Sequence, residues 1–247
     1  MKNNGLKNET RFVEAINGKT FDELSPALRD LLAHANMIQR DVPYIANLCN
    51  RYSKPDITIW AGSRPLHLSI KSGTSDSIHF ENVKSHVLFL RKIGISAETQ
   101  KTFLLYYYGD GTMDGSGKRK MSFEETLSWL RARIEEANRE INDPAFRKAL
   151  LDRFLLKGRE GREIRADYIV YGTPESFIFV SREDVEKAFP FLLHKKRRGL
   201  RFGPMTFQPY LRKSYWSKAR KDNDHYQVKW HGMVFDFEYI RFGAKDD

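Results

Sequence analysis

The sequence predicts a mixed α/β fold (α+β in its order of elements), with a central mixed β-sheet flanked by helices. Three observations support this prediction. Stretches with apolar residues at helical spacing alternate with short β-branched runs along the chain. Hydrophobic residues make up 40% and aromatic residues 13% of the 247 residues, a composition typical of globular proteins. A chain of this length can bury a sizeable core, as one large domain or two small ones.

The first third of the chain is predicted to hold helices around a β-hairpin. Ser25-Pro26 is a favourable pair for the N-cap and first turn of a helix, and Pro43 is expected to break or kink that helix. The hairpin is indicated by two β-branched runs around a turn containing glycine and proline. Helices are expected at residues 8–16, 25–52 and 80–93, and strands at 56–60 and 66–71.

The middle of the chain continues with one strand and two helices. Thr102–Tyr108 is an apolar and aromatic run, which predicts a buried strand. Ser122 and Glu125 form a capping-box pattern at the start of a helix that is expected to end at Ile141. A further helix is expected at Pro144–Leu156, with proline in its first turn.

The last third of the chain is predicted to be rich in strands. One strand pair is expected around Gly172-Thr173-Pro174, and residues 181–184 are expected to cap a short helix. Residues 226–230 and 233–242 are expected to form a terminal hairpin. We expect a boundary at residue 156, between a first region over residues 1–156 and a basic, β-rich region over residues 157–247, either separate or packed as part of one domain.

The first predicted hairpin brings an acidic and a basic residue to the same end of two strands. Asp56 precedes the first run and Lys71 ends the second, so folding the hairpin would bring the two together. A carboxylate can hold a hard cation through oxygen, and a lysine can orient or help to deprotonate a water. This pair is the minimum set for metal-assisted phosphodiester hydrolysis. A structural salt bridge is the alternative interpretation.

The pattern Pro55-Asp56 followed by Ser69-Ile70-Lys71 resembles the PD-(D/E)xK nuclease superfamily, which includes most type II restriction endonucleases. The family pattern has an acidic residue where this chain has Ser69, and a hydroxyl is a poor ligand for a divalent cation. Some members with Ser-x-Lys bring the carboxylate from the following helix. The resemblance therefore implies that Glu81, at the expected start of that helix, supplies the missing ligand.

Further residues extend the resemblance over roughly residues 8–110. The sequence pattern Ser-Ile-Lys-Ser-Gly-(x)4-Ile-His-x-Glu, together with Asn8-Glu9, is similar to that of a group of restriction-type nucleases. Family members often carry an acid on the first helix, where Glu9 and Glu14 are the candidates here. The resemblance implies a restriction-endonuclease-like αβββαβ core, provided that a further strand precedes or joins the hairpin.

The activity that the resemblance implies is Mg²⁺-dependent cleavage of double-stranded DNA at a specific sequence. Asp56 and Glu81 would bind Mg²⁺, Lys71 would position the attacking water, and Ser69 would bond a metal-bound water or only fill space. The family further implies a homodimer and a cognate DNA methyltransferase. Two alternatives stay open: a repair or junction-resolving nuclease, and a non-catalytic DNA-binding protein with a degenerate site.

Positive charge is concentrated in one C-terminal stretch. The chain has 42 Lys and Arg against 32 Asp and Glu, a net charge of +10. Residues 187–221 contain eleven Lys or Arg and no acid, so the rest of the chain sums to −1. Aromatic residues alternate with these cations, as in many nucleic-acid-binding segments. A solvated basic face is the alternative. The predicted DNA-binding residues are Lys195, Lys196, Arg197, Arg198, Arg201, Lys213, Lys218 and Arg220.

Three weaker candidates were weighed beside the main site. Gln227-Val228-Lys229 with Asp167 is a rival acid-like-x-Lys pattern, although a solvent-facing strand is the simpler account. His79, two residues before Glu81, could contact a phosphate or water, but a structural role is favoured. The segment 110–117 resembles the start of a calcium-binding loop. Such a loop requires glutamate at its twelfth position, which is Met121 when counted from Asp110.

The single cysteine and the termini bear on the compartment. Cys49 excludes a disulfide framework and is best explained as a small buried hydrophobic residue in a reducing compartment. The first ten residues are polar and charged, and no apolar run approaches the ~20 residues of a membrane helix. We therefore expect a cytoplasmic protein with no membrane partner.

Overall fold

The computed structural model describes residues 4–50, 54–72, 76–158, 163–192, 198–209 and 224–243. The chain forms two compact units. Unit 1 comprises Met1–Asp76, Leu151–Ala188 and Gly232–Asp247, and unit 2 comprises Ser77–Leu150 and Phe189–His231. This division differs from the expected one at residue 156, because the chain leaves unit 1 and returns to it twice. Both units combine helices with a β-sheet, so the prediction of a mixed α/β fold is confirmed.

Unit 1 is built on a five-stranded mixed sheet in the order β1-β2-β3-β5-β6. β1, β2 and β3 form an antiparallel meander, β5 runs parallel to β3, and β6 returns antiparallel to β5. The predicted hairpin is confirmed, with Ile57 opposite Leu68. β1 is the further strand that the αβββαβ order requires before the hairpin. The strands span Ile45–Leu48 (β1), Ile57–Ala61 (β2), Arg64–Lys71 (β3), Tyr168–Thr173 (β5) and Ser176–Ser181 (β6).

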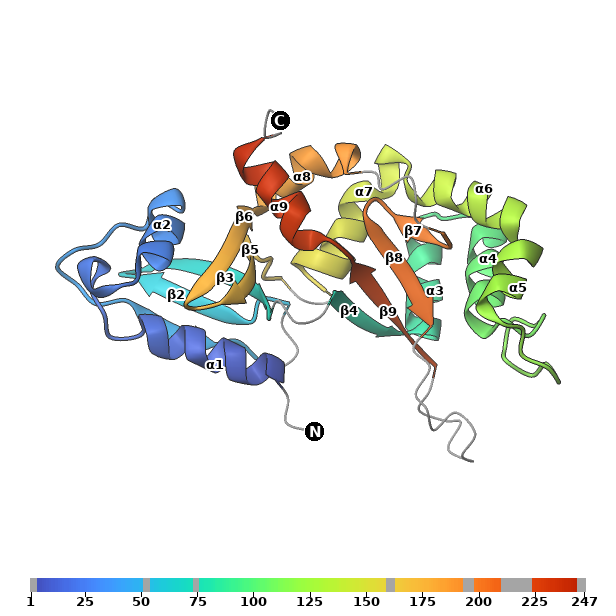
Figure 1. Ribbon diagram of the computed structural model, residues 1–247, viewed down its shortest axis with the longest axis horizontal. Coiled ribbons are helices and arrows are strands. Elements are labelled where there is room, and N and C mark those ends of the chain that lie inside the picture. The colour runs from blue at the N-terminus through green and yellow to red at the C-terminus, as the bar shows by residue number, and fades with distance from the viewer. Residues whose placement is uncertain are drawn as a thin grey trace. The chain divides into compact units, whose positions relative to one another are not determined.

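The helices of unit 1 pack on this sheet (Figure 1). Phe12 and Ile16 of the first helix share a buried core with Ile57, Leu68 and Val170 of the strands. Over the described residues, unit 1 has five helical segments and a single π-helical turn, η2, which begins directly after residue 151. They span Asn4–Ile16 (α1), Phe21–Glu23 (η1), Pro26–His34 (α2), Asp152–Leu156 (η2), Arg182–Ala188 (α8) and Met233–Phe242 (α9).

Two predictions for unit 1 were wrong. The helix expected over residues 25–52 ends at His34, because Asn36 takes a left-handed conformation with φ 54° and turns the chain toward β1. The strand expected over residues 233–242 is the helix α9. Its Arg241 pairs with Asp30 and stacks on the ring of Phe179, with its guanidinium carbon 3.4 Å from the ring centroid. Tertiary contacts thus decided the conformation of a segment whose aromatic residues suggested a strand.

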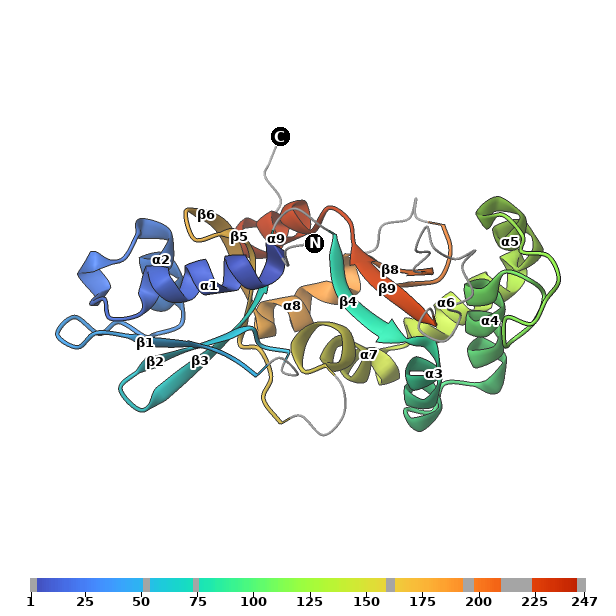
Figure 2. The ribbon, with the colours of Figure 1, turned by 90° about the horizontal axis from the view of Figure 1, so that it is seen from below.

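Unit 2 has its own four-stranded antiparallel sheet, in the order β4-β9-β8-β7. Figure 2 shows β4, β9 and β8 beside one another, with α3 next to the end of β4. The strands span Ser77–Asn82 (β4), Arg201–Phe202 (β7), Met205–Pro209 (β8) and His225–Trp230 (β9). The helices span Val83–Lys92 (α3), Ala97–Tyr108 (α4), Phe123–Trp129 (α5), Arg131–Ile141 (α6), Pro144–Leu151 (α7) and Phe189–Phe191 (η3).

Three predictions for unit 2 are corrected. Residues 102–108 are the second half of α4, which is buried around most of its circumference and so lacks helical amphipathicity. The helix expected from residue 80 begins only at Val83, because the Asn82 side chain caps it by accepting from the amides of Lys84 and Ser85. The single helix expected at 122–141 is two helices, which meet at Leu130.

Within the described ranges, no helix is long and apolar enough to span a bilayer.

Candidate active site

Asp56 lies at the entrance of β2, and its backbone is fixed from both sides. Its amide donates to the Leu68 carbonyl of β3 at 2.8 Å, and its carbonyl accepts from the Cys49 amide, just beyond β1, at 2.9 Å. These bonds extend the strand pairing by one residue before Ile57, the first residue of β2. The position of the Asp56 side chain is therefore set by the sheet and not by a free loop.

Ser69 and Lys71 project from the face of β3 opposite the hydrophobic core. Leu68 and Ile70 are buried in the core cluster, and side chains alternate between the two faces of a strand. Ser69 is fully buried, whereas the Lys71 side chain keeps 13% of its surface exposed. The alternation therefore delivers a hydroxyl and an ammonium to the side of the sheet that holds Asp56.

A compact polar cluster joins these residues. One carboxylate oxygen of Asp56, Oδ2, accepts from the Ile70 amide at 2.5 Å and from Ser69 Oγ at 3.3 Å, and lies 3.6 Å from Lys71 Nζ. Lys71 Nζ donates to Ser69 Oγ at 3.0 Å and to the Ile70 carbonyl at 3.2 Å. The second oxygen of Asp56, Oδ1, accepts no hydrogen bond from any described residue, and 21% of the side chain is exposed. One oxygen is thus held in place while the other is available.

Glu9, on α1, completes the electrostatics of this cluster. Partial burial raises the pKa of its carboxyl group to about 7, with a further upward contribution from the negative charge of Asp56 and a downward one from Lys71. The Glu9 carboxylate makes no hydrogen bond or ion pair with the rest of the described chain. The structure therefore brings four predicted site residues together in unit 1: Glu9, Asp56, Ser69 and Lys71.

Asn8 anchors the first helix beside the cluster. Its side chain is buried, and its Nδ2 donates to the carbonyl of Gly172, in β5, at 2.8 Å. Gly172 has φ +133°, and a Cβ at this position would lie 2.3 Å from the Ser176 carbonyl oxygen. Only glycine fits there. The anchor sets the depth at which Glu9, the next residue, sits relative to the sheet.

A second polar chain on the same strands was missed at the sequence level. Cys49 Sγ and Thr58 Oγ1 are hydrogen-bonded at 3.1 Å, and Thr58 Oγ1 and His67 Nδ1 at 3.0 Å. Burial raises the pKa of the Cys49 thiol, and the charges of Asp56 and Glu9 raise it further, while the Thr58 hydrogen bond lowers it. The period of two could have revealed this chain, because Thr58 follows Asp56 by two residues and His67 precedes Ser69 by two.

Glu81 lies in unit 2, one residue before the end of β4, where it pairs with Tyr226 of β9. Its side chain is fully buried, and its Oε2 lies 3.1 Å from His79 Nε2 and 3.4 Å from the hydroxyl of Tyr226. His79 thus has the structural partner that its favoured interpretation required. The structure gives Glu81 a place in the core of unit 2, and its role as a metal ligand stays a prediction.

The rival acid-like-x-Lys pattern is divided between the two units, and the 110–117 loop belongs to unit 2. Asp167 accepts from the His67 amide at 2.9 Å and pairs with Arg182 in unit 1, whereas Gln227 and Lys229 belong to β9 of unit 2. In the 110–117 loop, both carboxylate oxygens of Asp110 accept hydrogen bonds from the loop's own Thr112 and Gly117. That loop is therefore closed on itself.

Two of the eight predicted DNA-binding residues are described. Arg198 makes a two-pronged ion pair with Glu124, at 2.6 and 3.2 Å. Arg201 opens β7, and its amide donates to Asn138 on α6 at 2.8 Å. The other six lie outside the described residues: Lys195, Lys196, Arg197, Lys213, Lys218 and Arg220.

The donor set was tested against the predicted cation. Among the described residues, no group of three or more His, Cys, Asp or Glu side chains is arranged to hold a metal ion. The negative charges of two carboxylates, those of Asp56 and Glu9, nevertheless interact, and both groups have oxygens without hydrogen-bond donors in the described ranges. Mg²⁺ binds through one or two carboxylates and completes its octahedron with waters and substrate phosphates. The residues present fit that requirement.

Comparison with known proteins does not identify the chain. No family model matches it, and no curated protein or solved structure matches it.

Proposed function

We propose that this chain is a Mg²⁺-dependent endodeoxyribonuclease whose active site is the cluster of Glu9, Asp56, Ser69 and Lys71. One observation carries the proposal. The carboxylate of Asp56 and the ammonium of Lys71 lie 3.6 Å apart on adjoining strands, and the half-buried Glu9 is coupled to both charges. The order of α1, β1, β2 and β3 also supports it, because the resemblance implied a helix followed by three strands.

The cation would be held by Asp56 Oδ1 and the Glu9 carboxylate. When bound, Mg²⁺ would polarise the scissile phosphate and lower the pKa of a coordinated water. Glu9 is suited to this position because burial and the neighbouring Asp56 disfavour its charge and a divalent cation offsets both effects. Without a cation, two carboxylates whose negative charges interact are unfavourable to keep ionised.

Lys71 would stabilise the negative charge that develops on the phosphate during hydrolysis. Two of its three N–H donors are held by Ser69 Oγ and the Ile70 carbonyl, and the third is committed to no hydrogen bond within the described chain. A donor that is fixed before the reaction needs no reorganisation when charge develops. The buried hydroxyl of Ser69 positions both Asp56 and Lys71, which accounts for a serine at this strand position.

The resemblance adds finer expectations that stay predictions. It implies double-stranded DNA cut at a specific sequence, as in a restriction system with a cognate methyltransferase, and a homodimer in which two sites cut the two strands. A repair or junction-resolving nuclease would use the same cluster on DNA of a particular structure.

A non-catalytic DNA-binding protein is the second candidate, and one observation favours it. Ser69 stands where the family pattern has an acid, and Glu81, the predicted replacement, is enclosed by His79 and Tyr226 in unit 2. If Glu9 also fails to serve as a ligand, Asp56 alone would have to hold the cation. A single carboxylate makes a weak Mg²⁺ site.

The deciding experiment is cleavage of mixed-sequence supercoiled plasmid with Mg²⁺, with EDTA in a parallel reaction. Lys71→Met is the test variant, and Lys84→Met, at an exposed position on α3, is the matched control. We expect cleavage that needs Mg²⁺ and falls at least about a hundredfold in Lys71→Met but not in the control. Discrete fragments would indicate sequence specificity. Plasmid that is bound yet uncut by the wild type would overturn the nuclease proposal in favour of the binding protein.

A further inference from the structure

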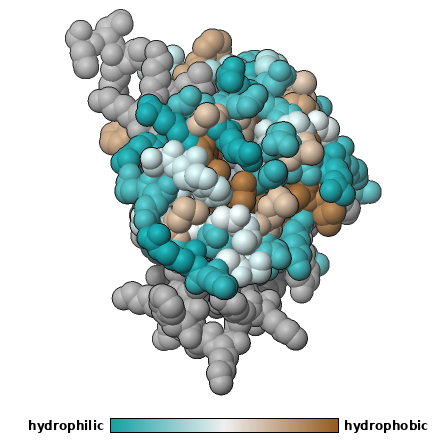
Figure 3. Space-filling view, turned by 90° about the vertical axis from the view of Figure 1, so that its right-hand side faces the viewer, coloured by the Kyte–Doolittle hydropathy of each residue, from teal (hydrophilic) through white to brown (hydrophobic). Residues whose placement is uncertain are grey.

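A groove lined by arginines runs along α6 in unit 2. It consists of two adjoining hollows with volumes of about 600 Å³ and about 470 Å³. Both hollows are lined by Glu135, Asn138 and Arg201, so they form one continuous groove. Arg131 and Arg198 line the larger hollow and Arg139 lines the smaller one. The end of the unit that carries α4, α5 and α6 presents a mostly hydrophilic surface (Figure 3).

Two asparagines of α6 fix the wall of this groove. Asn138 donates to the Gly199 carbonyl at 3.0 Å and accepts from the Arg201 amide at 2.8 Å. Asn142, one turn later, donates to the Arg201 carbonyl at 3.1 Å and accepts from the Gly203 amide at 2.7 Å. These four bonds hold the segment 199–203 alongside the helix as a strand would be held. The backbone of Arg201 is therefore fixed on both sides, through its amide and through its carbonyl.

Positive charge exceeds negative charge in the groove. Four arginines line it against Glu124 and Glu135, a balance of +2. Glu124 pairs with Arg198 and Glu135 with Arg131, and all four side chains are at least 65% exposed. Ion pairs in such exposed positions contribute little to stability. A phosphate could therefore replace the carboxylates, and the arginine fork binds phosphate with two parallel hydrogen bonds.

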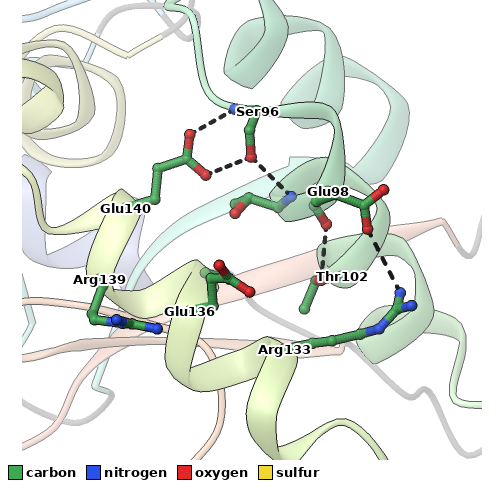
Figure 4. Close-up of a pocket in the computed structure, with 9 residues that line it drawn as sticks. Ser96, Glu98, Thr102, Arg133, Glu136, Arg139 and Glu140 are labelled. Carbon is green, nitrogen blue, oxygen red and sulfur yellow. Dashed lines mark hydrogen bonds and ion pairs between the residues drawn. The ribbon is translucent and has the colours of Figure 1, made fainter.

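The hollow beside the first turn of α4 provides a contrast. It lies between α4 and α6 and is lined by Glu98, Glu136 and Glu140 against Arg133 and Arg139. Figure 4 shows Glu140 directed toward Ser96 and Glu98 directed toward Arg133. The Glu140 carboxylate accepts hydrogen bonds from the amide and the hydroxyl of Ser96, at 2.7 Å each. Its acids outnumber its arginines and its groups largely satisfy one another. Of these two sites, the groove lined by Arg201 is the one with an excess of arginine.

We propose that the groove of Arg131, Arg139, Arg198 and Arg201 binds the phosphate backbone of a nucleic acid. Arg131 and Arg139 are eight residues apart on one helix, which corresponds to about 12 Å. Cations spread over that length can contact successive phosphates of one strand, whereas a single headgroup or free phosphate would engage only part of the groove. The proposal rests on the proposed nuclease function for its choice of DNA as the nucleic acid.

The test measures DNA affinity as a function of salt. Binding of a labelled short DNA duplex is followed by fluorescence anisotropy in EDTA over a series of NaCl concentrations. The test variant is Arg131→Gln with Arg201→Gln. The control is Arg133→Gln with Arg91→Gln, which removes the same charge from the same unit outside the groove. Arg131→Gln alone, at an 83% exposed position, is the alternative test variant. It is used if thermal unfolding shows that the double variant is poorly folded.

Two lost phosphate contacts should weaken binding about tenfold or more and reduce the slope of log K against log salt by about 2. The single variant should reduce the slope by about 1. Equal losses in test and control variants, or unchanged binding in the test variant, would overturn the proposal. The proposal would also be overturned if anionic lipid vesicles bound the wild type but not the groove variant, while the two proteins bound DNA equally well. A protein that binds through the groove but never cleaves refutes only the nuclease function.

Discussion

Asp56 in unit 1 and Glu81 in unit 2 are both carboxylates beside a basic side chain on a strand, yet their surroundings differ. Lys71 Nζ lies 3.6 Å from Asp56, and His79 Nε2 lies 3.1 Å from Glu81. The Asp56 side chain is 21% exposed, whereas that of Glu81 has no exposed surface. Asp56 also has a second carboxylate, Glu9, coupled to it, whereas Glu81 has the hydroxyl of Tyr226.

This difference bears on which of the two carboxylates a cation could reach. A cation needs oxygen atoms that it can reach and that no protein donor already occupies. Asp56 Oδ1 meets this condition within the described residues, and Glu81 Oε2, with two protein partners, does not. Burial alone does not identify a site, because a buried carboxylate with good hydrogen bonds is also a stabilising part of a folded core.

The largest expected effect is that of Asp56→Asn on cleavage. The amide keeps the shape of the side chain but loses the charge that would hold a cation and face Lys71. Cleavage of plasmid DNA in Mg²⁺ should fall about a thousandfold, or about 4 kcal/mol of transition-state stabilisation. Asp41→Asn, at an exposed position, is the control. Wild-type rates in Asp56→Asn would remove this cluster from the mechanism.

Much of the cluster's geometry could be predicted from the sequence. Pro, Gly and β-branched residues indicated the hairpin, and a hairpin places Asp56 opposite Ser69 and near Lys71 without further information. Glu9 followed from the resemblance alone, because nothing local indicates that α1 would lie at that end of the sheet. Its position depends on the contact of Asn8 with Gly172, and the two are 164 residues apart in the chain.

The fold was predictable where patterns were local and failed where burial was complete or contacts were distant. Residues 102–108, the second half of α4, were predicted as a strand because the buried tyrosines give no amphipathic period. Glu81 was placed at a helix start, but the Asn82 cap begins α3 only after it. The pairing of β4 with β9 brings Glu81 to Tyr226, across 145 residues, and no local signal in the sequence reports such a contact.

Substitution of Glu81 is expected to give the next largest effect, and on stability instead of chemistry. Glu81→Leu fills the space but leaves His79 and the Tyr226 hydroxyl without their acceptor. The loss of a buried acceptor should lower the free energy of unfolding by about 3 kcal/mol, which urea denaturation would measure. Glu81→Gln keeps an acceptor, so we expect a loss of about 1 kcal/mol and cleavage close to that of the wild type. If Glu81→Gln instead lost cleavage as fully as Asp56→Asn, at unchanged stability, Glu81 would belong to the cation site.

Asn8→Ala tests the anchor that places Glu9 beside Asp56. The variant loses the hydrogen bond to the Gly172 carbonyl, and the free energy of unfolding should fall by about 1.5 kcal/mol. Because α1 would be less firmly held, cleavage should also fall more than it does in Thr10→Ala, on the same helix, whose hydroxyl bonds only to the Leu6 carbonyl within that helix. Equal cleavage in the two variants would show that the Asn8 anchor has no bearing on the site.

The smallest expected effect is the pH dependence that Glu9 gives to the stability of the protein without a cation. The pKa of Glu9 is raised from 4.5 to about 7 in the folded protein. This contribution to stability is fully present below pH 4.5 and is lost as the pH rises through 7, because the folded state then has to hold an unfavourable charge. The full shift corresponds to roughly 3 kcal/mol, which partial exposure screens to roughly 1 kcal/mol.

Urea denaturation in EDTA at pH 5 and pH 8 should therefore show that Glu9→Gln loses less stability over this interval than the wild type. Glu14→Gln, at an exposed position on the same helix, should behave like the wild type. If Glu9→Gln and the wild type had the same pH dependence, Glu9 would not share the field of Asp56, and the cluster would have one carboxylate, as the binding-protein alternative requires.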